Sequence, residues 1–288
     1  MNSDLVEING VHLFVRTAGP PDGFPLLLLH GWPDTGDGWR RVAGRLEDTF
    51  RLIIPDQRGF GGSSMPKGTT SYALSRLMGD IMGLAEWARV ERLGIVGHDF
   101  GGAMAWGAGT FLGGLVERIV VMSVPHPKNW KLVAAGNPEQ MARSAYTFLL
   151  NLGEEGEAVL AAGEYRELAD WVYGSVLSDG EKDSLRANWS EPGRFHAMAE
   201  WYRANYRPSL LDASVPVNLP DVTVPTRYLH GLDDFAFVPA LARGNGAFVS
   251  AEYDEILIGD GGHWLQLTHP DLVADAVRDW MTRSSGSR

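Results

Sequence analysis

The sequence predicts an α/β fold: a mostly parallel sheet flanked by helices, with an inserted helical lid, or cap. Short apolar runs alternate with helical stretches in the first 124 residues and again after residue 226, which is the pattern of a parallel sheet with crossover helices. Between these parts lies a segment rich in Ala, Glu, Arg, Trp and Tyr that lacks strand-like runs. We therefore expect a core formed by residues 1–127 and 221–288, and a helical cap at 128–220.

Apolar and polar periodicity predicts the elements of the first half. Residues 6–17 alternate around Asn9 and Gly10, a dipeptide that favours a type I′ turn and hence a hairpin. Continuous apolar runs predict strands that are buried on both faces, and apolar residues at helical spacing predict helices between them. In chain order we expect a strand at 26–29, a helix at 39–46, strands at 51–55 and 93–96 with a helix at 74–90 between them, and a strand at 118–124.

After the cap the same alternation resumes. Residues 226–230 and 252–258 have the apolar character of strands, and 238–247 and 270–282 have helical spacing. We expect the Ser, Gly and Arg tail at 284–288 to be frayed. Functional loops should lie at the carboxyl ends of the parallel strands.

Bulk composition excludes several functions. The chain of 288 residues carries a formal net charge of −11 and no cluster of Lys or Arg, which argues against a nucleic-acid partner or an anionic membrane. It has no cysteine, so disulfides, thiolate catalysis and Cys-ligated metals are excluded. The N-terminus lacks the basic and apolar regions of a signal peptide. We expect a cytoplasmic monomer or homodimer that uses neither a metal nor an organic cofactor.

Residues 97–102, Gly-His-Asp-Phe-Gly-Gly, follow an apolar run and precede a segment of small residues. This is the pattern of a nucleophile elbow, a sharp turn between a strand and a helix. The middle residue is Asp99, and a carboxylate can attack without deprotonation a carbon that bears a leaving oxygen or halide. The alternative is an aspartate that merely caps the helix. The glycines on both sides favour the nucleophile.

A covalent ester of Asp99 must be hydrolysed, which needs a base and an acid that orients the base. In elbow folds these partners follow in the order nucleophile, acid, histidine. Asp233 and Asp234 come just after one predicted strand. His263 comes just after the last predicted strand, preceded by two glycines and followed by Trp264. The chemistry of the residues leaves Asp233 and Asp234 both open as the acid.

The tetrahedral intermediate of such a hydrolysis needs two hydrogen-bond donors, the oxyanion hole. We expect them to be the backbone N–H groups of Phe100, which follows the nucleophile, and of Trp32, in the loop after the strand at 26–29. The alternative for the sequence His-Gly-Trp-Pro at 30–33 is a plain turn. His30 itself is better interpreted as a structural hydrogen-bonding residue beneath this loop.

These motifs together resemble those of epoxide hydrolases with the α/β-hydrolase fold, in particular the soluble class. The resemblance covers nearly the whole chain and rests on the loops at 30–33, 56–64, 97–102, 234–239 and 258–264. The spacing to Pro239 favours Asp234 as the acid.

The resemblance also implies two cap tyrosines that hold and protonate the epoxide oxygen. Tyr202, in Trp-Tyr-Arg, matches one of them and Tyr146 matches the other, although residues 149–153 depart from the family pattern downstream. The alternative is that these tyrosines only pack at the interface of cap and core. The implied partners are a small-molecule epoxide, apolar or aryl, and water. The implied product is a vicinal diol, formed through a covalent aspartate ester.

Two other functions use the same fold. Haloalkane dehalogenases resemble this chain in the nucleophile, acid and histidine, but they stabilise the halide with an indole N–H after the nucleophile, where this chain has Phe100, which has no donor. Fluoroacetate dehalogenases carry arginines near the nucleophile, where this chain has Phe100 and Ala103. A non-catalytic binding protein is the alternative of another class; the presence of all the expected site residues argues against it.

Overall fold

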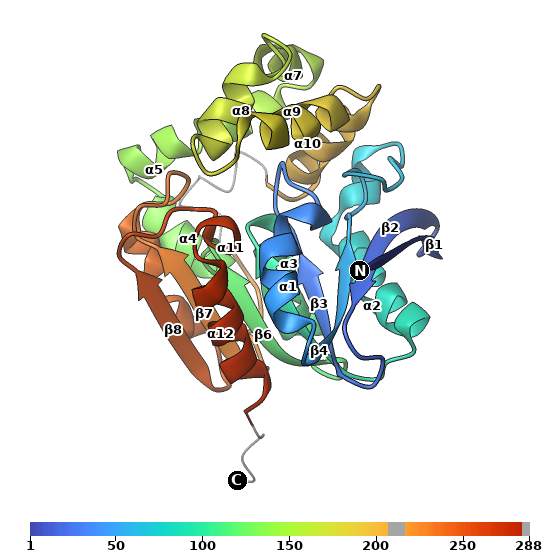
Figure 1. Ribbon diagram of the computed structural model, residues 1–288. Coiled ribbons are helices and arrows are strands. Elements are labelled where there is room, and N and C mark those ends of the chain that lie inside the picture. The colour runs from blue at the N-terminus through green and yellow to red at the C-terminus, as the bar shows by residue number, and fades with distance from the viewer. Residues whose placement is uncertain (207–216, 284–288) are drawn as a thin grey trace.

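The computed structural model describes residues 1–206 and 217–283. A single sheet of eight strands crosses the molecule in the order β1-β2-β4-β3-β5-β6-β7-β8 (Figure 1). Strands β3 to β8 pair in parallel, whereas β1 with β2 and β2 with β4 pair antiparallel. The strands are β1 Asn2–Ile8, β2 Val11–Ala18, β3 Phe24–Leu29, β4 Phe50–Pro55, β5 Leu93–His98, β6 Val116–Met122, β7 Thr226–Gly231 and β8 Tyr253–Ile258.

The predicted N-terminal hairpin is confirmed. Ile8 pairs with Val11 across a two-residue turn, and the turn residues Asn9 and Gly10 have φ of +50° and +77°. Positive φ at both positions is what a type I′ turn requires.

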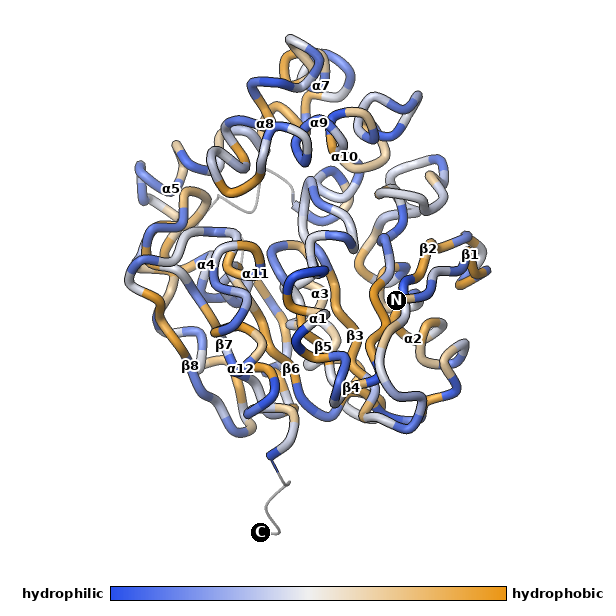
Figure 2. The backbone as a smooth tube through the Cα atoms, in the orientation of Figure 1, coloured by the Kyte–Doolittle hydropathy of each residue, from blue (hydrophilic) through white to orange (hydrophobic). Residues whose placement is uncertain are grey.

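Helices cover both faces of the sheet and bury its apolar strands, which Figure 2 shows as mostly orange tubes in the centre of the molecule. One face packs against α2 and α3, and the other packs against α1 and α12. These helices and the short α11 are α1 Arg40–Leu46, α2 Leu74–Ala88, α3 Phe100–Phe111, α11 Leu265–Thr268 and α12 Pro270–Met281. The predicted mostly parallel α/β fold is thereby confirmed.

The helix predicted at 238–247 is wrong. The chain forms two single 3-10 turns there, Pro239–Ala242 and Asn245–Phe248. Arg243 between them is extended, with ψ of 158°, and Gly244 has φ of +85°. An extended residue followed by a left-handed one ends the helical path, although the apolar spacing continues.

Among the described residues between β6 and β7, where a cap was expected, the structure has seven helices. Figure 1 shows α7 to α10 above the carboxyl ends of the strands, and α4 closer to the sheet. They are α4 Pro127–Ala134, α5 Pro138–Arg143, α6 Ala145–Asn151, α7 Glu154–Leu160, α8 Arg166–Tyr173, α9 Asp179–Trp189 and α10 Arg194–Asn205. The limits 128 and 220 stay a prediction, and positions 207–216 of the expected cap, like the tail at 284–288, lie outside the described residues.

Three tryptophans form hydrogen bonds between the cap and the core. Trp189 Nε1 donates to the Pro33 carbonyl at 2.9 Å, and Trp201 Nε1 donates to the Arg58 carbonyl at 2.9 Å. From the core, Trp264 Nε1 donates to the Val172 carbonyl at 2.7 Å. Each of these tryptophans is at most 2% exposed. Each therefore combines buried apolar packing with a directional hydrogen bond.

Within residues 1–206 and 217–283, the structure contains no helix whose length and apolar character would allow it to cross a bilayer.

A buried ion pair between Arg58 and Asp80 joins the loop after β4 to α2. Arg58 Nη2 and Nε lie 2.5 and 2.6 Å from the two carboxylate oxygens of Asp80. Burial raises the pKa of Asp80, and the guanidinium opposes that rise. Because neither side chain reaches bulk water, the fork-shaped pairing keeps both charges tolerable inside the protein.

We expect Asp80→Asn to lower the free energy of unfolding by about 3–5 kcal/mol, because it leaves the Arg58 charge buried and unpaired. The matched control is Asp48→Asn, which breaks the exposed pair between Asp48 and Arg278 and should cost less than about 1 kcal/mol. Urea unfolding of both variants measures the difference. If both variants lose the same free energy of unfolding, the buried pair stabilises the protein no more than the exposed one, and the prediction is wrong.

Candidate active site

The turn at Asp99 joins β5 to α3 and depends on close backbone approach. Asp99 has φ of +51° and ψ of −120°. Residues other than glycine rarely adopt this conformation, and it is typical of nucleophile elbows. A Cβ added at Gly97 would lie 2.1 Å from the Gly101 carbonyl oxygen, and one added at Gly101 would lie 2.1 Å from that of Leu29. The two glycines therefore allow neighbouring backbone segments to approach closely, while the aspartate itself adopts the positive φ.

The Asp99 carboxylate does not cap α3, since that helix, which lies wholly in the described part, has no side-chain capping bond at its start. Instead Asp99 Oδ1 accepts the backbone N–H of Trp32 at 2.8 Å. Burial raises the pKa of Asp99, and the charge of His263 and the N–H groups of Trp32 and Phe100 oppose the rise. The two backbone groups predicted to form an oxyanion hole thus both face this carboxylate.

His263 lies between two carboxylates. Its Nδ1 is 2.9 Å from Asp234 Oδ2, and its Nε2 is 3.7 Å from Asp99 Oδ2. All three side chains are buried. Asp233, the other candidate acid, is exposed, so the structure brings Asp234 and not Asp233 to the histidine.

The two carboxylates determine the charge state of His263. Burial lowers the pKa of His263, but Asp234 and Asp99 outweigh it, so its pKa is raised above the ordinary value. Burial raises the pKa of Asp234, yet the histidine and the N–H of Ala236 outweigh it, and the pKa is lowered. Asp234 Oδ1 accepts the N–H groups of Ala236 and Phe237 at 2.7 and 3.2 Å. The acid is therefore held ionised and oriented.

Two buried residues that the sequence interpretation missed hold the backbone of His263. The carbonyl of His263 accepts a hydrogen bond from Ser123 Oγ at 2.8 Å and from His98 Nε2 at 2.9 Å. Ser123 follows β6 with φ of +53°, and His98 ends β5. Their only signal in the sequence is their place at the carboxyl end of a strand, which is where site residues of parallel sheets gather.

Tyr146 on α6 and Tyr202 on α10 meet above Asp99. Their hydroxyl oxygens are 3.0 Å apart, and both rings contact Trp32, with centroids 5.6 and 5.5 Å away. Burial raises the pKa of each phenol, and the charge of Asp99 adds to the rise. Two neutral phenols thus belong to an aromatic cluster beside one carboxylate.

Three phenylalanines extend this aromatic cluster. The ring of Phe100 lies 4.7 Å from Tyr202, Phe195 lies 6.2 Å from Trp32, and Phe235 lies 5.2 Å from His263, each measured between centroids. Phe100 offers no polar atom beside Asp99 other than its backbone.

His30 lies beneath the loop of the oxyanion donors, as predicted. It is fully buried; its Nε2 accepts the N–H of Gln57 at 3.0 Å, and the side-chain amide of Gln57 donates to the His30 carbonyl at 2.6 Å. Burial lowers the pKa of His30 to about 4. The ring is therefore neutral and structural, and the prediction is confirmed.

Within the described part of the chain, no three His, Asp or Glu side chains are grouped so that they could hold an ion. What the arrangement offers is a carboxylate, an imidazole, two phenols and two backbone donors around one point.

We expect Gly101→Ala to lower the free energy of unfolding by about 2–3 kcal/mol, because its methyl group would overlap the carbonyl oxygen of Leu29 and force the elbow apart. Gly114→Ala is the control, since a Cβ there meets nothing within 4 Å, and surface changes of this kind stay within about 0.5 kcal/mol. Urea unfolding compares the two. An equally small effect at Gly101 would contradict the close approach.

Known proteins resemble this chain over nearly its full length. The family model described as alpha/beta hydrolase fold matches residues 25–270. The AB hydrolase superfamily protein YfhM of Bacillus subtilis is 31% identical, with 96% of each chain covered. Epoxide hydrolase A of Mycobacterium tuberculosis is 28% identical with the same coverage. A solved structure of epoxide hydrolases of the alpha/beta hydrolase superfamily, from metagenomes of hot environments, matches with a TM-score of 0.86 at 30% identity, covering 98% of this chain and 99% of that one. The expected resemblance to epoxide hydrolases is confirmed, and the chain belongs to the α/β-hydrolase superfamily.

Proposed function

We propose that this protein hydrolyses an apolar or aryl epoxide to a vicinal diol through a covalent ester on Asp99. The observation that carries the proposal is the placement of a buried carboxylate between an imidazole 3.7 Å away and a facing pair of phenols. Named epoxide hydrolases among the relatives, such as that of Mycobacterium tuberculosis, support the same activity.

In the first step a carboxylate oxygen of Asp99 attacks an epoxide carbon, and the bond from that carbon to the ring oxygen breaks. Tyr146 and Tyr202 donate hydrogen bonds to the oxygen, and one of them gives it a proton as the alkoxide forms. Their raised pKa values keep both phenols protonated beforehand. The product is a hydroxyalkyl ester of Asp99.

In the second step His263 takes a proton from water, and the hydroxide attacks the carbonyl carbon of the ester. The N–H groups of Trp32 and Phe100 stabilise the oxyanion of the tetrahedral intermediate. Asp234 keeps the imidazole oriented and stabilises its charged form. Collapse of the intermediate breaks the bond between the carbonyl carbon and the ester oxygen, and that oxygen takes the remaining proton of the added hydroxyl, which releases the diol and restores the Asp99 carboxylate. The proton on His263 returns to the tyrosinate.

Two features support an apolar epoxide over the alternatives. Near Asp99 the rings of Trp32, Phe100, Phe195 and the two tyrosines pack against one another, and such aromatic surroundings favour apolar or aryl groups. A dehalogenase would need side-chain donors for the leaving halide, and Phe100 supplies none. The tyrosine pair is, in contrast, suited to an oxygen that must be protonated.

We expect His263→Gln to accumulate a covalent adduct with styrene oxide, because the ester forms but no base activates water. Intact-mass spectrometry would show the protein mass increased by one substrate. Asp99→Asn is the control and should give no adduct and no stable turnover; slow recovery would report deamidation of the new amide. Absence of an adduct in His263→Gln together with full activity of Asp99→Asn would exclude the ester mechanism.

We expect Tyr146→Phe and Tyr202→Phe each to lower kcat for styrene oxide at least about tenfold, and the double variant by about 10²–10⁴, the range of general acid catalysis. Tyr206→Phe is the matched control: its ring lies 6.2 Å from Tyr202, and its hydroxyl is not part of the pair. Diol formation and halide release are assayed side by side. Halide release from haloalkanes without diol from epoxides would favour the dehalogenase, and neither product would favour a binding protein.

A further inference from the structure

The loop that follows β7 carries Asp234 and depends on side chains of the cap for its hydrogen bonds. We call residues 234–238 the acid loop. Within the described ranges, residues 235–237 form no hydrogen bond to another backbone group. Instead, the N–H groups of Ala236 and Phe237 donate to Asp234 Oδ1. The path of this loop therefore determines where the Asp234 carboxylate lies.

The side-chain amide of Gln140, on α5, binds the backbone of the acid loop. Its Nε2 donates to the Ala236 carbonyl at 2.8 Å, and its Oε1 accepts the N–H of Val238 at 2.9 Å. The same Nε2 donates to Ser144 Oγ at 2.9 Å. Gln140, Ala236 and Val238 are all buried. Loss of the amide would therefore leave a buried donor and a buried acceptor of the loop unpaired, which is costly.

A second side chain of α5 holds the same loop. Arg143 Nη1 donates to the carbonyls of Asp234 and Phe237, the latter at 3.0 Å. Its Nη2 donates to Glu139 Oε1 at 2.7 Å, which fixes the guanidinium. Gln140 and Arg143 are three positions apart and so lie on one face of the helix. The two side chains together bind the acid loop along its length.

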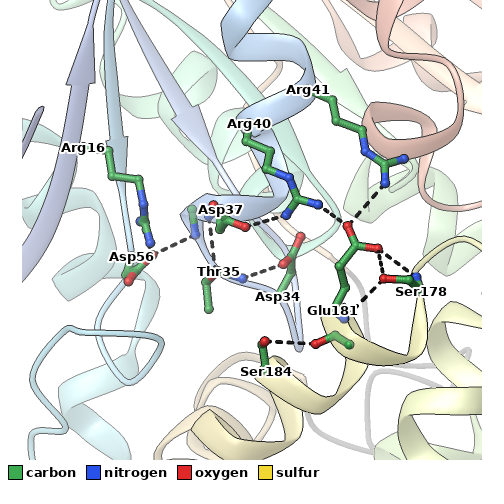
Figure 3. Close-up of polar contacts among 12 residues, drawn as sticks. Arg16, Asp34, Thr35, Asp37, Arg40, Arg41, Asp56, Ser178, Glu181 and Ser184 are labelled. Atoms are coloured by element: carbon green, nitrogen blue, oxygen red, sulfur yellow. Dashed lines mark hydrogen bonds and ion pairs between the residues drawn. The ribbon is translucent and has the colours of Figure 1, made fainter. Parts of the chain in front are cut away.

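Other contacts between the cap and the core reach segments that carry no site residue. Figure 3 shows Glu181 of α9 with Arg40 and Arg41 of α1. These ion pairs are partly exposed, and such pairs contribute little to stability. The buried contact at the acid loop is of a different kind.

Asn205, at the end of α10, makes a contact of the same form as that of Gln140. Its Nδ2 donates to the Tyr72 carbonyl at 2.9 Å, and its Oδ1 accepts the N–H of Leu74 at 2.9 Å. The amide again binds a carbonyl and the N–H group two positions later. It therefore provides a matched contact between cap and core that lies away from the acid loop.

We propose that Gln140, with Arg143 beside it, is a positioning residue for His263: it holds the acid loop so that Asp234 stays against the histidine. The Gln140 amide fixes Ala236, whose N–H binds Asp234 Oδ1, and Asp234 Oδ2 lies 2.9 Å from His263 Nδ1. The catalytic consequence rests on the proposed function, whereas the effect on the histidine itself does not.

The test begins with a pH titration of the His263 imidazole nitrogens by NMR, in the full chain and in Gln140→Met, which removes the amide at similar volume. Burial lowers the pKa of His263, and the charges of Asp234 and Asp99 raise it. A displaced Asp234 raises it less. We therefore expect a lower pKa of His263 in Gln140→Met, with at least about a threefold loss of proton affinity. Asn205→Leu, the matched control, should leave the pKa nearly unchanged.

The same variants are then mixed with styrene oxide and quenched at short times. Hydrolysis of the ester, which needs an oriented His263, should slow at least about tenfold in Gln140→Met. Formation of the ester, which needs Asp99 and the tyrosines, should slow less than about threefold. Intact-mass spectrometry should therefore show more ester in Gln140→Met than in the unaltered protein or in Asn205→Leu.

Arg143→Gln keeps the test decisive if Gln140→Met fails to fold, because the Arg143 side chain is partly exposed. Removal of a cation would by itself raise the pKa of His263, so the lower pKa that we expect reports a displaced acid loop. An unchanged pKa of His263 in the folded variants, or an equal fall in Asn205→Leu, would overturn the proposal. A lower pKa with no ester in any variant, the unaltered protein included, would support the positioning role and contradict epoxide hydrolysis.

Discussion

The site depends on one backbone constraint, the positive φ of Asp99 at the junction of β5 and α3. Holding a residue other than glycine in such a conformation costs about 1–3 kcal/mol. The buried strands on either side of β5, at β3 and β6, offset that cost, because the turn cannot relax without breaking their packing. Gly31 has no side chain, so the neighbouring loop can approach the Asp99 side chain closely. The turn therefore holds the carboxylate against the backbone donors of that loop.

The same carboxylate also changes the pKa of His263 during the proposed cycle. The charge of Asp99 helps to raise the pKa of His263. When Asp99 becomes an ester that charge disappears, so the pKa of the histidine falls towards the value set by burial and Asp234. A histidine with a lower pKa is neutral in a larger fraction of molecules, and neutral imidazole is the form that accepts a proton. Ester formation thus prepares the base at the step that needs it.

The sequence could predict what local patterns determine. The hairpin at Asn9, the buried strands and the order of the loops carrying Asp99 and His263 all follow from turn chemistry and periodicity. What failed depended on distant partners or on single backbone angles. Gly244 breaks a stretch with helical spacing, and Ser123 reaches His263 across 140 positions of the chain. The choice of Asp234 over Asp233 came from the family resemblance and not from the chemistry of the residues, because the two differ in burial, which no local pattern encodes.

The loop after β3 connects the candidate site to the cap. The N–H of Trp32 donates to Asp99, the carbonyl of Pro33 accepts the indole N–H of Trp189 from the cap, and the buried carboxyl of Asp34 accepts the N–H of Thr35. Three successive residues of one backbone segment therefore contact Asp99, the cap and the turn that the loop enters.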